Sequence, residues 1–201
     1  MNAAEQVDHA EAMAQRLHFD QPDVLGHIQA ALVGRNVMLN RFDRVASGLQ
    51  VMQEAARVSG DALAKVRVQC WQYLAIDSGQ KLQQLEGVQA ALASLADEPR
   101  VAAVRVQCLS ASADLKSDIG RHEDAIGDLT AALQVARTYP AGLRGSEPLY
   151  ESKVGQLLMQ AGRLMDADLH FARAGEQLVR LGKEKSVDRA SITAAGQSLT
   201  Y

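Results

Sequence analysis

The chain has 201 residues, of which 47% are hydrophobic, and its formal net charge is −3. This apolar content is enough for a substantial core and excludes a disordered chain. Because the basic residues form neither a surplus nor a stripe, we expect no binding to nucleic acid. No apolar run approaches the ~18 residues of a membrane-spanning helix, and no polybasic segment indicates contact with a membrane surface.

The first residues include Glu5, Asp8 and Glu11, whereas a signal peptide would be basic and then apolar at this point. Cys70 and Cys108 both lie within helical patterns, and we expect two separate, buried thiols. Thiols in a chain without an export signal indicate a reducing compartment. We therefore predict a cytoplasmic location.

Abundant Ala, Leu, Gln and Val, with only 4% aromatic residues, favour closely packed helices over strands. Pro99 and Pro140 fall between predicted helix pairs, while Gly79, Gly120 and Gly162 fall between paired helices. Apolar residues recur with helical spacing from one end of the chain to the other. The predicted helices cover residues 3–17, 22–38, 42–58, 61–77, 80–96, 100–118, 122–138, 146–161, 164–181 and 185–200.

The sequence contains internal repeats. The pentapeptide VRVQC at residues 66–70 recurs at residues 104–108, an offset of 38. A second offset, of 42 residues, relates two longer patterns. Each has a small residue, a glycine seven positions later, an alanine five beyond, a large apolar residue after four more, and a final alanine three further on. These positions are Ala113, Gly120, Ala125, Leu129 and Ala132, followed by Gly155, Gly162, Ala167, Phe171 and Ala174.

This pattern resembles the tetratricopeptide repeat, which has a small residue in its first helix, a turn glycine, and two alanines flanking a large apolar residue in its second helix. Gly34, Val37 and Ala46 indicate a weaker earlier copy, and the resemblance covers residues ~20–182. The offsets exceed the usual repeat of about 34 residues. Lengthened units of this kind are similar to those in large bacterial transcription activators and in helical regions attached to some bacterial serine/threonine kinases.

The resemblance implies an all-α fold, a right-handed α-solenoid of about four helix hairpins with a flanking helix at each end. We predict a single domain over residues 1–201, because one hairpin cannot bury its apolar face without a neighbour. The predicted units cover residues 20–59, 60–98, 99–140 and 145–182, with end helices at 3–17 and 185–200.

In the tetratricopeptide family, the first helix of each unit lines a concave binding face. The corresponding positions are polar, mixed in charge and rich in amides, which both donate and accept hydrogen bonds and so suit a peptide backbone or a partner helix. The set lacks the basic clamp with which some family members hold a C-terminal carboxylate. It consists of Arg35, Gln69, Tyr73, Gln107, Ser110, Asp114, Ser152 and Gln156.

The sequence shows no pattern of catalytic or metal-binding residues. The histidines have no zinc-ligand spacing, and no serine lies in a nucleophile-elbow context. The glycine pair Gly142 and Gly145 lacks the spacing of a phosphate-binding loop. We therefore predict no catalytic activity, no cofactor and no metal site.

These observations predict a protein- or peptide-binding scaffold, the interaction or regulatory segment of a larger bacterial signalling protein. Two alternatives stay open. The same surfaces could join two copies of the chain into a homodimer. The domain could instead be a sensor that binds a small ligand or a signal peptide and controls an attached effector.

Overall fold

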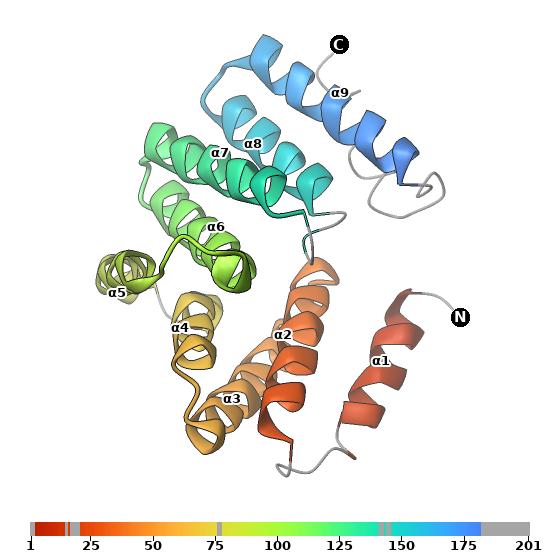
Figure 1. Ribbon diagram of the computed structural model, residues 1–201. Helices are drawn as coiled ribbons and strands as arrows, with labels where there is room; N and C mark the ends of the chain where they lie inside the picture. Colours follow the sequence, from red (N-terminus) through yellow and green to blue (C-terminus); the bar gives the residue numbers. More distant parts are fainter. Residues whose placement is uncertain are drawn as a thin grey trace. The chain divides into compact units, whose positions relative to one another are not determined.

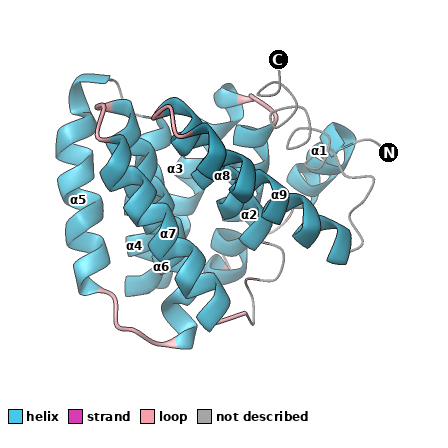
Figure 2. Ribbon diagram, turned by 90° about the horizontal axis from the view of Figure 1, so that it is seen from above, coloured by secondary structure: helices cyan, strands magenta, loops and turns pink. Residues whose placement is uncertain are grey.

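The computed structural model describes residues 3–14, 16, 21–75, 78–140, 143 and 146–181. Within these ranges the secondary structure is helical, without strands (Figure 2). The chain divides into two compact units, Met1–Gly87 (unit 1) and Val88–Tyr201 (unit 2). The α-helices are α1 (Ala3–Ala14), α2 (Pro22–Met38), α3 (Phe42–Ser59), α4 (Ala62–Trp71), α5 (Lys81–Ser94), α6 (Ala102–Asp118), α7 (His122–Thr138), α8 (Glu147–Gln160) and α9 (Leu164–Arg180).

The all-α prediction is confirmed, and successive helices pack as antiparallel pairs: α2 with α3, α6 with α7, and α8 with α9 (Figure 1). The bounds predicted for α2 and α7 coincide with those in the structure. The helix predicted at residues 185–200 lies outside the described residues. None of the helices in the described part of the chain has the length and apolarity that a membrane crossing requires.

The turns of the three hairpins have the same conformation. The second residue after the first helix has a positive φ: 56° at Asn40, 80° at Gly120 and 77° at Gly162. Left-handed backbone of this kind favours Gly and, after it, Asn. In each turn the next residue is an arginine whose backbone N–H donates back to the end of the first helix. The three bonds are Arg41 to Asn36 at 2.9 Å, Arg121 to Lys116 at 2.8 Å, and Arg163 to Leu158 at 2.8 Å.

This shared turn corrects the predicted register of the first unit by one residue. Since Asn40 is the counterpart of Gly120, the position equivalent to Ala125 is Val45 and not Ala46. Val45 is 1% exposed, whereas Ala46 is an exposed residue. The prediction failed because it matched the small residues Gly34 and Ala46 to Ala113 and Ala125. In this hairpin the equivalent buried positions are valines, Val33 and Val45, and Asn40 takes the place of the turn glycine.

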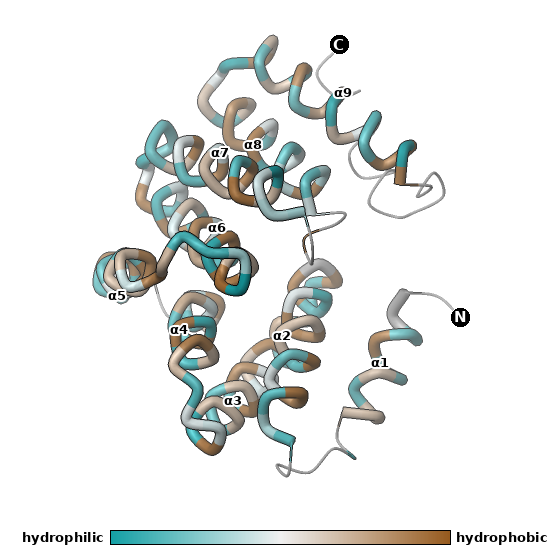
Figure 3. The backbone as a smooth tube through the Cα atoms, in the orientation of Figure 1, coloured by the Kyte–Doolittle hydropathy of each residue, from teal (hydrophilic) through white to brown (hydrophobic). Residues whose placement is uncertain are grey.

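The core of unit 2 forms around the small residues of the repeated pattern. Ala113, Ala125 and Ala167 are each 0% exposed. In the α8–α9 hairpin the ring of Phe171 lies directly over Gly155, and a Cβ added to that glycine would lie 2.9 Å from the Cε1 atom of the ring. Figure 3 shows apolar and polar residues alternating along these helices, as packing on one side requires.

The helix predicted at residues 61–77 is shorter than expected. Asp61 caps its start, since its carboxylate accepts hydrogen bonds from the backbone N–H groups of Leu63 and Ala64. After Trp71 the chain tightens into a 3-10 helix over Gln72–Ala75. Because residues three apart eclipse one another in a 3-10 helix, this places Trp71 and Leu74 together against the core of unit 1.

Both cysteines are fully buried, at 0% exposure each, as expected for their helical positions. Neither Cys70 nor Cys108 is a free thiol, however. The prediction of two separate thiols is therefore wrong, because the spacing of cysteines along helices does not reveal which sulfur atoms meet. The cysteines consequently give no support to a reducing compartment.

Candidate functional site

A row of polar side chains runs along the first helices of the two hairpins in unit 2. We define the α6–α8 strip as Ser110 and Asp114 on α6 with Lys153 and Gln156 on α8. The ammonium group of Lys153 donates to the Ser110 hydroxyl at 2.7 Å and to the two Asp114 carboxylate oxygens at 2.9 and 3.1 Å. The side chains of Lys153 and Asp114 are 28% and 33% exposed, so the pair is partly desolvated and still reachable from solvent.

Tyr150, on α8, is a buried residue close enough to Asp114 to feel its charge. Its side chain is buried and belongs to the core of unit 2. Burial raises the pKa of its hydroxyl, and the negative charge of Asp114 acts in the same direction. The Tyr150 hydroxyl therefore keeps its proton, and the only formal charges within the strip are those of Lys153 and Asp114, which balance.

The polar row continues toward the hairpin turns. The Ser117 hydroxyl, on α6, donates to the Gln160 amide oxygen, on α8, at 3.4 Å, and lies 3.5 Å from Nδ1 of His122. Hydroxyl and amide groups therefore border the strip at this end. No group of three or more His, Cys, Asp and Glu among the described residues is arranged to hold a metal ion.

The predicted site residues of unit 2 differ in exposure and in whether they belong to the strip. Ser110 and Asp114 share Lys153, and Gln156 is exposed one turn further along α8. Ser152 is only 8% exposed and lies inside the packed unit. Gln107 is half-buried, and its amide oxygen is buried without a hydrogen-bond partner among the described residues.

In unit 1 the predicted site residues differ in their contacts and in their exposure to solvent. Gln69 holds α5 against α4, because its amide donates to the Gly87 carbonyl at 3.0 Å and its own carbonyl accepts from Gln84 at 2.7 Å. Arg35 is exposed on α2, and Tyr73 is half-buried in the 3-10 turn. The side chain of Gln69 is thus already engaged within the fold.

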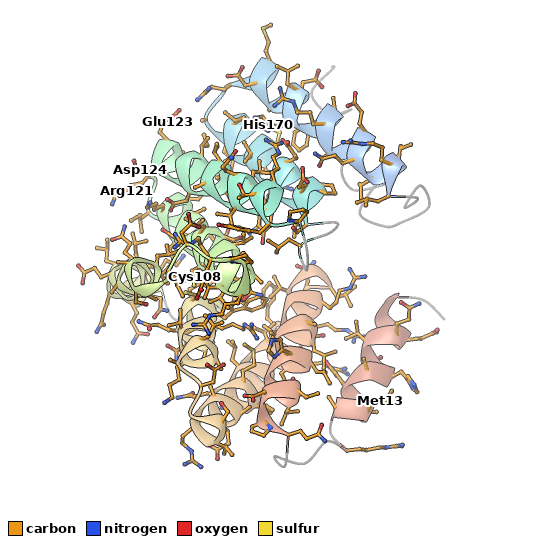
Figure 4. All side chains as sticks on the ribbon, in the orientation of Figure 1. Met13, Cys108, Arg121, Glu123, Asp124 and His170 are labelled. Atoms are coloured by element: carbon orange, nitrogen blue, oxygen red, sulfur yellow. The ribbon has the colours of Figure 1, made fainter. Side chains whose placement is uncertain are left out.

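Sequence reasoning missed Lys153, although it is the only basic residue on α8. The signal in the sequence was a single basic residue on a helix face whose other residues are apolar or uncharged. It also missed Glu151, a carboxylate with 0% exposure. Glu151 accepts from the Arg137 guanidinium at 2.6 Å and lies 2.6 Å from Nδ1 of His170, a residue of α9 that is labelled in Figure 4. This cluster ties α7, α8 and α9 together.

Unit 1 contains a small pocket between α2, α3 and α4, with a volume of about 20 Å³. Arg67 lines it at 9% exposure, and its Nε is buried without a hydrogen-bond partner within the described residues. Its Nη2 lies 3.4 Å from Nε2 of His27, whose Nδ1 is 2.7 Å from the Asp23 carbonyl oxygen. Since a carbonyl only accepts, Nδ1 carries the proton and Nε2 accepts from Arg67. Burial lowers the pKa of the guanidinium, against the opposing charge of Asp61.

The paired helices, the shared turns and the polar row on first helices define a tetratricopeptide-like helical repeat. No model of a known protein family matches the chain, and no curated protein sequence matches it. Among solved structures, the chain is similar to a signal transduction ATPase with numerous domains (STAND) that has a tetratricopeptide repeat sensor, from Pyrococcus horikoshii. That likeness has a TM-score of 0.51 at 15% identity and covers 97% of this chain and 32% of the other.

A second similar structure is BtubC (BKLC) from P. vanneervenii, with a TM-score of 0.48 at 18% identity, covering 100% of this chain and 66% of that protein. This chain therefore spans less than two thirds of the length of either protein. At such identities the likeness to the STAND protein shows the fold alone.

Proposed function

We propose that the chain is a protein- or peptide-binding scaffold and that the α6–α8 strip is a contact surface for the bound chain. The observation that carries the proposal is the Lys153–Asp114 pair. It holds one cation and one anion in fixed positions, partly shielded from water, on the row of first helices where the family places its ligands.

The chemistry of the strip suits an extended peptide. Ser110 and Gln156 supply groups that both donate and accept, which a peptide backbone needs along its whole length. A charged side chain of the bound peptide can form an ion pair with Lys153 or with Asp114, in place of the pair that these two residues form with each other. Because the strip carries one positive and one negative charge, it favours a peptide that also carries both signs of charge. A peptide with charges of only one sign would place like charges opposite each other, which weakens binding.

The same fold supports the wider reading of the chain as a segment of a larger signalling protein. The STAND protein is described as having a tetratricopeptide repeat sensor, and this chain corresponds in length to about a third of it. We propose that partner binding by this chain regulates an attached activity. We propose no reaction for the chain itself, since the strip pairs its cation with its anion and leaves neither to activate a nucleophile.

Selection of binding peptides tests the proposal. Random twelve-residue peptides displayed on phage would be selected on the immobilised chain, and the affinity of an enriched synthetic peptide would be measured by calorimetry. We expect Asp114→Arg, which places two cations side by side in the strip, to weaken binding by roughly tenfold or more. The charge exchange Asp114→Lys with Lys153→Asp should recover a large part of the loss while keeping the fold.

The matched control is Glu176→Arg, a charge reversal of the same size at an exposed position of α9 outside the strip. We expect its affinity for the selected peptide to equal that of the unmodified chain. Equal affinities for the Asp114→Arg variant and the unmodified chain would remove the strip from the binding surface. Light scattering over a concentration series distinguishes the homodimer, whose mass would rise with concentration and would fall back in the Asp114→Arg variant.

A further inference from the structure

Helix α1 lies against α2 in unit 1 with a small apolar contact (Figure 1). The contact consists of one valine and two alanines of α1, placed on three larger aliphatic residues. These are Val7, Ala10 and Ala14 on α1, with Ile28, Leu32 and Leu39 beneath them. Met13, beside Ala14 on α1 and labelled in Figure 4, is 58% exposed. Alanine side chains bury little apolar area, so this contact stabilises the docked helix only weakly.

Charges hold α1 more specifically. Asp8 receives the guanidinium of Arg41 at 2.6 Å and that of Arg44 at 2.6 Å, and Glu11 receives Arg44 at 2.6 Å. The hydrogen bond from Arg41 holds the pKa of Asp8 below its ordinary value, with Arg44 acting in the same direction. The side chain of Asp8 is 46% exposed, so salt in solution screens these pairs.

Beneath α1 lies a polar group that α1 satisfies incompletely. Asn36 is 2% exposed, and its amide nitrogen donates to the Glu11 carboxylate at 2.6 Å. The amide oxygen of Asn36 is also buried but has no hydrogen-bond partner within the described part of the chain. A buried acceptor without a hydrogen bond destabilises the state that buries it. The surface is thus shaped for a helix bearing acidic groups, and α1 fits it imperfectly.

In unit 2, too, the arginine in the turn of a hairpin contacts the helix that precedes that hairpin. The turn arginine Arg163 reaches Glu123 on the preceding helix, α7, at 3.2 Å, as Arg41 reaches Asp8 on α1. Helix α7 is in addition paired with α6, whereas α1 is bound to its hairpin by the small contact and the ion pairs described above.

We propose that the α1-binding face of unit 1 is a docking site for an acidic amphipathic helix of a partner protein, and that α1 occupies it in cis as a competitor. The face consists of Ile28, Leu32, Asn36, Leu39, Arg41 and Arg44. The guest presents small apolar residues at positions i, i+3 and i+7 and carboxylates at i+1 and i+4, which is the pattern of α1 itself. The site is independent of the α6–α8 strip and of the function proposed for it.

The test uses the whole chain and a fluorescein-labelled synthetic peptide with the sequence of residues 1–17, followed by fluorescence anisotropy. Tethering gives α1 an effective concentration of about a millimolar, so the unmodified chain should bind the peptide weakly. The double variant Asp8→Lys, Glu11→Lys repels its own α1 from the arginines and leaves the face intact. We expect this variant to bind the peptide at least about tenfold more tightly than the unmodified chain, because the competitor is gone.

Two further changes are made within that double variant. Arg44→Ala removes a cation from the face, and we expect it to reverse the gain by about tenfold. Arg57→Ala, also on α3 but paired with Glu54 on its own helix, is the matched control and should retain the gain. A folded double variant that binds the peptide no better than the unmodified chain would overturn the proposal, as would an equal effect of the two arginine changes.

Hydrogen exchange on the unmodified chain keeps the proposal testable if the double variant does not fold. We expect the amides of α1 to exchange faster than those of α2, and faster again in roughly 0.5 M NaCl, where the ion pairs are screened. Protection of α1 equal to that of α2 and insensitive to salt would refute the proposal. Concentration-dependent dimerisation that Arg44→Ala abolishes would also refute it, in favour of exchange of α1 between two copies.

Discussion

Replacing Gly155 with alanine tests the close approach on which the α8–α9 hairpin depends. In the middle of a helix, Gly→Ala normally stabilises by about 1 kcal/mol, because alanine loses less backbone entropy on folding. At Gly155 the new Cβ would lie 2.9 Å from one atom of the Phe171 ring and 3.1 Å from two others. Carbon atoms prefer separations of about 3.5–4.0 Å, so the ring must move.

Phe171 has little room to move, since it is 4% exposed within the core of unit 2. Overpacking of this kind costs about 1–3 kcal/mol, and we take the upper end because three ring atoms are affected. Subtracting the helix gain leaves Gly155→Ala destabilised by about 1–2 kcal/mol. The matched control is Gly127→Ala in α7, an exposed helical position where an added Cβ meets nothing within 4 Å. This control should gain about 1 kcal/mol.

Urea denaturation followed by circular dichroism would measure both variants, and we expect their midpoints to move in opposite directions. The double variant Gly155→Ala, Phe171→Leu provides a further check. Leucine removes the ring atoms that clash, so the cost of the alanine should be smaller in that background than in the unmodified chain. Equal stabilisation by Gly155→Ala and Gly127→Ala would refute the idea that the glycine is there to admit the ring.

Three more predictions concern charged groups. Glu151→Gln keeps the volume but removes a buried charge bonded to two cationic or protonatable partners, and we expect a loss of about 2 kcal/mol in thermal or urea unfolding; unchanged stability would contradict the assignment of this cluster as a clamp. Arg67→Met replaces a buried cation without an ion pair among the described residues, and we expect unfolding to become harder by about 1 kcal/mol, whereas a clear loss would show that the cation is satisfied. The pKa of Asp8 is lowered in the folded chain, so its stabilisation is present above the ordinary aspartate pKa and is lost as the pH falls through the folded value. The NMR signals of α1 should therefore shift on acidification below about pH 4, and Asp8→Asn should remove that step.

Local patterns predicted the helices well because helix formation depends on residues close together in the chain. Apolar spacing predicted the observed bounds of α2 and α7, and the repeated pattern contains Gly155 and Phe171, which pack against each other in unit 2. The predicted register of the first hairpin was displaced by one residue because its closely packed positions hold Val33 and Val45, where small residues were expected. The correct register could still be found from the sequence, because the pair Asn40–Arg41 corresponds to the pair Gly120–Arg121 of the later turn.

The polar contacts could not be predicted in the same way, because they depend on which helices become neighbours. Gln69 looked like a groove residue, but the path of α5 brings the Gly87 carbonyl within reach of its amide. Lys153 and Asp114 are 39 positions apart, and their ion pair exists only because α6 and α8 lie side by side. Helix periodicity is determined within a few turns of chain and is therefore readable from sequence. The choice of ion-pair and hydrogen-bond partners follows from tertiary packing, which alone decides which polar groups are bonded and which still face the solvent.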